Sequence, residues 1–171
     1  MILREATPAD IPALSKLATD SFIAKFGHLY SAENLAMFLE ENLSGQAITA
    51  ELANPDRVYR LAEGDDGALL GYAKIGLNCG FPDHARGGRV MELKQLYAAP
   101  EATGKGIGGA LMDWAMDQFA AREADEAQLS VYAHNEGAHR FYRRYGFEKV
   151  ADITFRVGTH IDPEFLFARM L

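Results

Sequence analysis

Residues 96–111 read LYAAPEATGKGIGGAL, and this stretch decides the fold. A strand-like start at Leu96 passes through a glycine-rich turn into a helix with periodic apolar residues. Glycines allow positive φ and a close approach of the backbone to a bulky anion, while the free amides at a helix start attract phosphate groups. Lys105 adds a positive charge. The stretch predicts a diphosphate-binding loop, although a purely structural turn between strand and helix explains the glycines equally well.

Two other phosphate-binding motifs contain similar glycines. A P-loop requires Gly-Lys-Ser/Thr, but Lys105 is followed by Gly106, which excludes it. The dinucleotide fingerprint Gly-x-Gly-x-x-Gly is formally matched by Gly104, Gly106 and Gly109. That fingerprint belongs at the end of an early strand, whereas this turn follows a late one. A Rossmann-type reductase is therefore a weaker alternative.

Residues 103–108, TGKGIG, resemble the acetyl-CoA signature Arg/Gln-x-x-Gly-x-Gly/Ala of the GNAT N-acetyltransferases. Thr103 departs from the usual Arg or Gln, so a side-chain contact to the pyrophosphate is weakened or replaced by one from a hydroxyl. The resemblance implies that amides of residues 103–109 hold the pyrophosphate. It also implies that the backbone of residues 96–98 pairs with the pantetheine arm as an added strand does.

A second block, residues 129–147, reads LSVYAHNEGAHRFYRRYGF. The family pattern Asn-x-x-Ala-x-x-Phe-Tyr followed by Gly-Phe is present here, with Asn135 and Tyr142 at its two ends. Both blocks stand in the family's order, and the resemblance is strong over the C-terminal half and looser before it. It implies a mixed α/β fold with a central, mostly antiparallel sheet flanked by helices. The implied donor-binding residues are Leu96, Tyr97, Ala98, Thr103, Gly104, Lys105, Gly106, Ile107, Gly108, Gly109 and Asn135.

The hydrophobic pattern of the whole chain predicts a strand, two or three helices, three strands, a helix, a strand, a helix and two strands. Such an order favours a mixed sheet covered by helices. One domain spanning residues 1–171 is expected. The predicted strands are 2–6, 58–62, 69–75, 89–98, 128–133, 148–155 and 164–171. The predicted helices follow residues 10 and 31, span 46–52 and 136–145, and run from the glycine turn to about residue 123.

The composition of the chain limits the classes of partner that it is expected to bind. The 171 residues include 17 basic and 24 acidic ones, a formal charge of −7 that disfavours nucleic acid and anionic membranes as partners. A cationic acceptor is compatible with this charge, which is also ordinary for a soluble protein. A single cysteine, Cys79, and the lack of a long apolar run predict a cytoplasmic protein without disulfides. Exposed helix faces and the last strand are compatible with a homodimer.

Acetyl transfer to an amine requires a base and a proton donor for the departing thiolate. Glu92, on the strand that approaches the glycine loop, is the candidate base, with a binding charge or an exposed glutamate as its alternatives. Tyr142 matches the family tyrosine near the coenzyme A sulfur, which implies that its hydroxyl protonates the leaving thiolate. The histidines lack metal-ligand spacing, so no metal is predicted.

The acceptor is the least determined part of the prediction. The early helices, the loop at residues 79–88 and the final strands are expected to form its pocket. Residues 26–31, the helix expected after them and residues 58–60 loosely resemble a GNAT subgroup that acetylates polyamines, which implies spermidine or spermine. Other small amines, peptide or protein amines and antibiotics stay open, as does an acyl-CoA-binding regulatory module without turnover. Carboxylates for a polyamine are available at Glu33, Glu40, Glu41 and Asp83.

Overall fold

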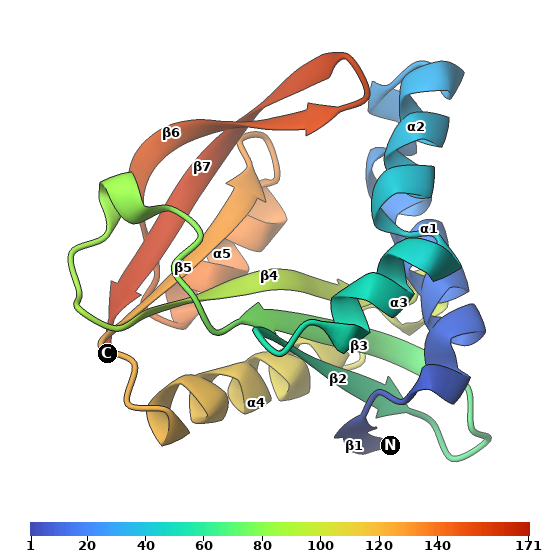
Figure 1. The fold of residues 1–171 in the computed structure, drawn as a ribbon, viewed down its shortest axis with the longest axis horizontal. Helices are drawn as coiled ribbons and strands as arrows, with labels where there is room; N and C mark the ends of the chain where they lie inside the picture. The colour runs from blue at the N-terminus through green and yellow to red at the C-terminus, as the bar shows by residue number, and fades with distance from the viewer.

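The computed structural model describes residues 1–171 and contains one seven-stranded sheet with helices packed on it (Figure 1). The strands are β1 (Ile2–Glu5), β2 (Arg57–Glu63), β3 (Leu69–Gly76), β4 (Val90–Ala98), β5 (Glu126–Tyr132), β6 (Glu148–Val157) and β7 (His160–Met170). The helices are α1 (Ile11–Phe26), α2 (Ala32–Asn42), α3 (Gly45–Ala53), α4 (Ile107–Ala121) and α5 (Glu136–Arg144). Short 3₁₀ turns occur at Pro8–Asp10, Gly27–Leu29, Pro82–His84 and Pro100–Ala102.

The strands lie in the order β1-β2-β3-β4-β5-β7-β6. Only β4 and β5 pair in parallel, which fits the crossover between them through α4, while all other neighbours are antiparallel. The predicted mixed, mostly antiparallel sheet flanked by helices is confirmed. The order of elements along the chain also agrees with the prediction, with all three early helices present.

Helices cover both faces of β3. Gly71 faces the start of α4, since a Cβ there would lie 2.8 Å from Cγ2 of Ile107 and 2.7 Å from the carbonyl oxygen of Tyr97. The close approach of α4 to the sheet therefore requires glycine at this position. The next residue, Tyr72, points to the other face, as alternation along a strand demands, and lines a pocket with Phe22 of α1.

The last strand begins earlier than predicted. The sequence pattern placed its start at residue 164, because Pro163 interrupts it and proline disfavours an interior strand. In the structure β7 begins at His160, and the Pro163 carbonyl accepts the amide of Ala133 at 3.0 Å. The β6–β7 hairpin reaches α2 (Figure 1). There Phe155 packs edge-on against Phe38, with ring centroids 5.7 Å apart. The hairpin thus closes one side of the space above β4 and β5.

Candidate active site

The glycine loop ends in a helix start with free amides. Gly104 and Gly106 adopt φ values of +77° and +81°, which glycine tolerates without strain. Gly106 is the N-cap of α4, and no side chain caps that helix. The first amides of α4 therefore lack side-chain partners and, with the helix dipole, form a site suited to a diphosphate.

Strands β4 and β5 separate before β4 reaches the glycine loop. Their parallel ladder runs from the pair Val90/Glu126 to the pair Leu93/Leu129 and stops there. Beyond it β4 continues to Ala98, paired with β3 alone, and β5 continues to Tyr132, paired with β7. One edge of the outer part of β4 is left without a neighbouring strand, so an extended ligand can add to it.

A groove, here called the donor groove, follows this open edge and encloses about 410 Å³. Its walls come from α1, β4, the glycine loop and α5. Lys25 contributes a cation, and burial lowers the pKa of its ammonium group. The lining residues are Ser21, Ala24, Lys25, Leu96, Tyr97, Ala98, Pro100, Thr103, Gly108, Gly137, Ala138, Phe141 and Tyr142.

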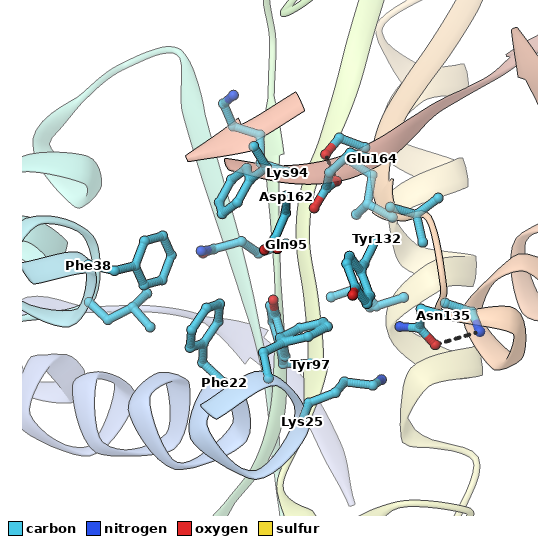
Figure 2. Close-up of a pocket in the computed structure, with 18 of the residues that line it drawn as sticks. Phe22, Lys25, Phe38, Lys94, Gln95, Tyr97, Tyr132, Asn135, Asp162 and Glu164 are labelled. Carbon is cyan, nitrogen blue, oxygen red and sulfur yellow. Dashed lines mark hydrogen bonds between the residues drawn. The ribbon is translucent and has the colours of Figure 1, made fainter. Parts of the chain in front are cut away.

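A second cavity, here called the central pocket, lies between the parted strands and encloses about 160 Å³ (Figure 2). Fourteen of its 21 lining residues are hydrophobic, many of them aromatic. Two carboxylates, Asp162 and Glu164 of β7, lie on one wall, across from Lys25 (Figure 2). The pocket adjoins the donor groove, because five residues line both: Lys25, Leu96, Tyr97, Ala138 and Tyr142.

Comparison with known proteins identifies the family to which this chain belongs. Residues 12–147 match the acetyltransferase (GNAT) family. The chain belongs to this family. An uncharacterized N-acetyltransferase of Mycobacterium bovis is 31% identical over 163 residues, which cover 95% of this chain and 98% of the relative. An uncharacterized N-acetyltransferase of Lactobacillus delbrueckii is 25% identical over 171 residues, 98% of this chain and 95% of the relative.

The fold of this N-acetyltransferase matches solved structures. The PaiA N-acetyltransferase of Thermoplasma acidophilum, crystallised with coenzyme A, superimposes with a TM-score of 0.79 over 99% of this chain and 98% of that one, at 22% identity. Its likeness confirms the GNAT architecture expected from the two sequence motifs.

The donor-binding residues expected in this acetyltransferase fall into two groups. Leu96, Tyr97, Ala98, Thr103 and Gly108 line the donor groove. The others in the loop are not part of its wall: Gly104, Lys105 and Gly106 form the exposed turn, Ile107 is buried in the core, and Gly109 lies in the first turn of α4. The Thr103 hydroxyl donates to the carbonyl of Pro100 at 3.0 Å, which closes the turn.

Tyr142 lies at the junction of the two cavities of the acetyltransferase. It projects from α5 and lines both, and its hydroxyl makes no hydrogen bond within the chain. Burial raises the pKa of this phenol, so it remains protonated at neutral pH. Asn135 caps α5, its side-chain oxygen accepting the amide of Ala138 at 3.2 Å, and it also lines the central pocket (Figure 2).

Glu92 does not share a cavity with Tyr142. It is 6% exposed, and its carboxylate accepts a hydrogen bond from Lys94 Nζ at 2.8 Å. The loop at residues 79–88 lies against it, since a Cβ at Gly80 would stand 2.1 Å from Glu92 Oε2. Glu92 lines neither cavity, and no residue of that loop lines the central pocket. The loop that was expected to help form the acceptor pocket therefore does not reach the central pocket.

The acidic wall of the central pocket was missed by the sequence analysis. Asp162 and Glu164 are 3% and 8% exposed, whereas the carboxylates expected to bind a polyamine (Glu33, Glu40, Glu41 and Asp83) are exposed and lie outside the pocket. Asp162 accepts hydrogen bonds from the Tyr30 hydroxyl and from His160 Nε2, the latter at 3.0 Å. The only signal of this wall in the sequence was that Asp162 and Glu164 are two residues apart, because this spacing places both side chains on one face of a strand.

Two further observations describe what the molecule contains elsewhere. No group of three or more His, Cys, Asp or Glu side chains is arranged to hold a metal ion. None of the helices combines the length and the apolar character that crossing a membrane requires.

Proposed function

We propose that this acetyltransferase transfers the acetyl group of acetyl-CoA to the primary amine of a small cationic acceptor, a polyamine or another small amine, by direct attack. The observation that carries the proposal is the pair Asp162 and Glu164, which face the pocket that Tyr142 shares with the donor groove. The proposal treats residues 1–171 as one acetyltransferase domain, because both cavities lie within a single sheet and its helices.

Acetyl-CoA supplies an acetyl group activated as a thioester. The open edge of β4 at Leu96, Tyr97 and Ala98 suits its pantetheine arm, and the free amides that follow Gly104 suit its pyrophosphate. Asn135 helps to orient the arm where α5 begins. The coenzyme A bound to the Thermoplasma protein of the same fold supports this choice of donor.

Tyr142 supplies the proton that the reaction must return. The amine nitrogen forms a bond to the thioester carbonyl carbon, the carbon–sulfur bond breaks, and the departing thiolate takes a proton from the Tyr142 hydroxyl. The nitrogen, which carries a positive charge after the attack, loses a proton that restores the Tyr142 hydroxyl and leaves a neutral amide. This role needs a phenol that is protonated before the step and close to both substrates. Its raised pKa and its place in both cavities support the assignment.

The walls of the central pocket favour a small, cationic acceptor. Aromatic rings at Phe22, Phe38 and Tyr97 line it, and such rings attract ammonium groups through their faces and pack against methylene chains. The volume of about 160 Å³ lies below the range of about 300–1,000 Å³ usual for drug-sized ligands. A small amine, or one end of a polyamine, therefore fits better than a bulky antibiotic.

The test is release of the coenzyme A thiol from acetyl-CoA with a panel of polyamines, monoamines, amino acids and peptide N-termini. Turnover with cationic small amines, and product mass increased by one acetyl group, is the expected result. Turnover with peptide N-termini alone contradicts the acceptor class. Tight acetyl-CoA binding without turnover on any amine favours a regulatory module, and binding of NAD(H) without acetyl-CoA binding contradicts the donor.

A further inference from the structure

Glu164 is the buried carboxylate that has no basic partner. Four carboxylates of the chain are buried: Glu92, Glu126, Asp162 and Glu164. The first three lie near Lys94, Arg86 and His160 respectively, at 2.8, 3.4 and 3.0 Å. No ion pair includes Glu164. A buried carboxylate is stable when paired with a cation, so this one suits a cation that arrives with the substrate.

The surroundings of Glu164 hold its carboxylate in the central pocket. Glu164 pairs across the sheet with Tyr132 of β5, and its Oε2 accepts a hydrogen bond from the Ser130 hydroxyl at 2.5 Å. It lies beside Asp162 on the wall of the central pocket that is across from Lys25 (Figure 2). Ser130 engages one carboxylate oxygen, and no hydrogen bond within the chain engages the other.

The chemistry of the acceptor requires a group of this kind. An alkyl ammonium has a pKa of about 10, so at neutral pH it must lose a proton before its nitrogen can attack. Burial raises the pKa of Glu164 to about 7, and the neighbouring charge of Asp162 acts in the same direction, while the Ser130 hydroxyl opposes both. A base with a pKa near the operating pH is the most effective.

The ionisable groups around Glu164 come from each neighbouring element. Asp162 lies on β7 itself, Tyr30 follows α1, and Tyr97 lies on β4; the last two have raised pKa values, chiefly through burial, and are uncharged at neutral pH. Lys94 of β4 also lines the pocket, but its ammonium group is paired with Glu92. Lys25 of α1 lines the opposite wall of the pocket and forms no ion pair with Glu164, and Tyr132 of β5 lies beside Glu164 in the sheet. Asp162 is the neighbour whose charge raises the pKa of Glu164.

We propose that Glu164, rather than Glu92, is the general base that removes the proton from the acceptor ammonium, an inference that rests on the proposed function. In this step a nitrogen–hydrogen bond breaks, the proton moves to the Glu164 carboxylate, and the freed lone pair attacks the thioester carbonyl. Ser130 is a positioning residue that orients the carboxylate. Glu92 is separated from this step by its pairing with Lys94 and by the loop that covers it.

The experiment compares the pH dependence of kcat/KM for the unsubstituted protein, Glu164→Gln and Glu92→Gln, with the exposed Glu148→Gln as matched control. The unsubstituted protein and Glu148→Gln are expected to lose activity below pH of about 7, the pKa of Glu164. Glu164→Gln is expected to lower kcat about 10²-fold or more at neutral pH and to abolish this acid limb. A fluorinated acceptor, whose ammonium loses its proton more readily, should recover much of the loss.

A second variant and a direct titration separate chemistry from folding. Ser130→Ala keeps the base but removes the hydrogen bond that lowers its pKa, so the acid limb should move to higher pH. Carbon NMR of labelled glutamate should show one side chain with a midpoint near 7, absent in Glu164→Gln. Acetyl-CoA affinity measured by calorimetry should be unchanged in both variants.

Three results overturn the inference. Glu164→Gln retaining the acid limb and losing less than about tenfold in kcat contradicts the base role, as does loss of that limb in Glu92→Gln instead. A rise in KM with unchanged kcat makes Glu164 a binding charge only. Absence of turnover in the unsubstituted protein on any amine contradicts the proposed function itself and this role with it.

Discussion

Gly67 and Gly106 share a left-handed backbone φ of +81°, and at neither would a Cβ meet another atom within 4 Å. One lies in the β2–β3 turn and the other caps α4 at the donor groove. Alanine at either position should therefore carry the same backbone strain, about 1 kcal/mol or somewhat more, without a steric clash. The two glycines form a matched pair in which only one adjoins the donor loop.

Gly106→Ala and Gly67→Ala should lower the free energy of unfolding by similar amounts in a urea titration. Only Gly106→Ala should also lower the affinity for acetyl-CoA, by about tenfold or more in calorimetry. The strained loop would no longer orient its backbone amides toward the pyrophosphate. Equal acetyl-CoA affinities in the two variants would contradict the role of the loop in binding the pyrophosphate.

Tyr142→Phe removes the hydroxyl and keeps the ring. We expect kcat to fall about 10²-fold or more, because the thiolate then leaves without its proton donor, while acetyl-CoA affinity changes little. Tyr59→Phe is the control, since Tyr59 is also buried but lines neither cavity. Equal rates for Tyr142→Phe and the unsubstituted protein would remove Tyr142 from the chemistry.

Glu164 makes the stability of the protein depend on pH in a defined direction. Its pKa rises from 4.5 to about 7 on folding, so between these values the folded state binds more protons than the unfolded state. The free energy of unfolding therefore falls as the pH rises through this range, by about 3 kcal/mol. Glu164→Gln lacks the penalty and should be more stable than the unsubstituted protein at pH 8 but not at pH 5.

Thermal unfolding at the two pH values measures this difference, and Glu148→Gln, exposed on β6, serves as the control. A melting temperature for Glu164→Gln that lies below that of the unsubstituted protein at pH 8 would show that the carboxylate is not destabilising when charged.

Glu126 anchors the loop before β4. Its fully buried carboxylate accepts the amides of Arg86 and Gly87, both at 2.7 Å. Glu126→Ala leaves both amides without this partner, so we expect a loss of about 2–3 kcal/mol in a urea titration and faster amide exchange in residues 86–89. Glu123→Ala, whose side chain is 90% exposed, should change stability by less than about 0.5 kcal/mol.

The order of elements was predictable because its signals are local. The glycine loop, the Asn135 cap and the apolar periodicity of α4 each lie within a short stretch, and they led to the family and to the donor side of the site. Thr103 shows the limit of such reasoning. Its contact with the pyrophosphate was expected to be weakened or made by the hydroxyl, and in the structure this hydroxyl donates to the carbonyl of Pro100 three residues earlier.

The acceptor side was not predictable for the opposite reason. Tyr30 and Asp162 are hydrogen-bonded across 132 residues of sequence, and no local pattern encodes such a contact. Pro163 also concealed the start of β7, so Asp162 fell outside the predicted strand. Glu92 was chosen for its place before the glycine loop, but which cavity a side chain reaches depends on the sheet and the covering loop.

The five residues common to the donor groove and the central pocket make these cavities adjacent parts of one candidate site. Direct attack, as proposed, needs both substrates together in a ternary complex, so initial-rate plots at several fixed acceptor concentrations should intersect rather than run parallel. Since the acetyl carbon has to reach the amine within that site, a bisubstrate compound linking the coenzyme A sulfur to the acceptor nitrogen through a two-carbon bridge would span it. Such a compound would make the contacts of both substrates, but only one molecule would lose translational and rotational entropy on binding. Its affinity should therefore exceed that of either substrate alone.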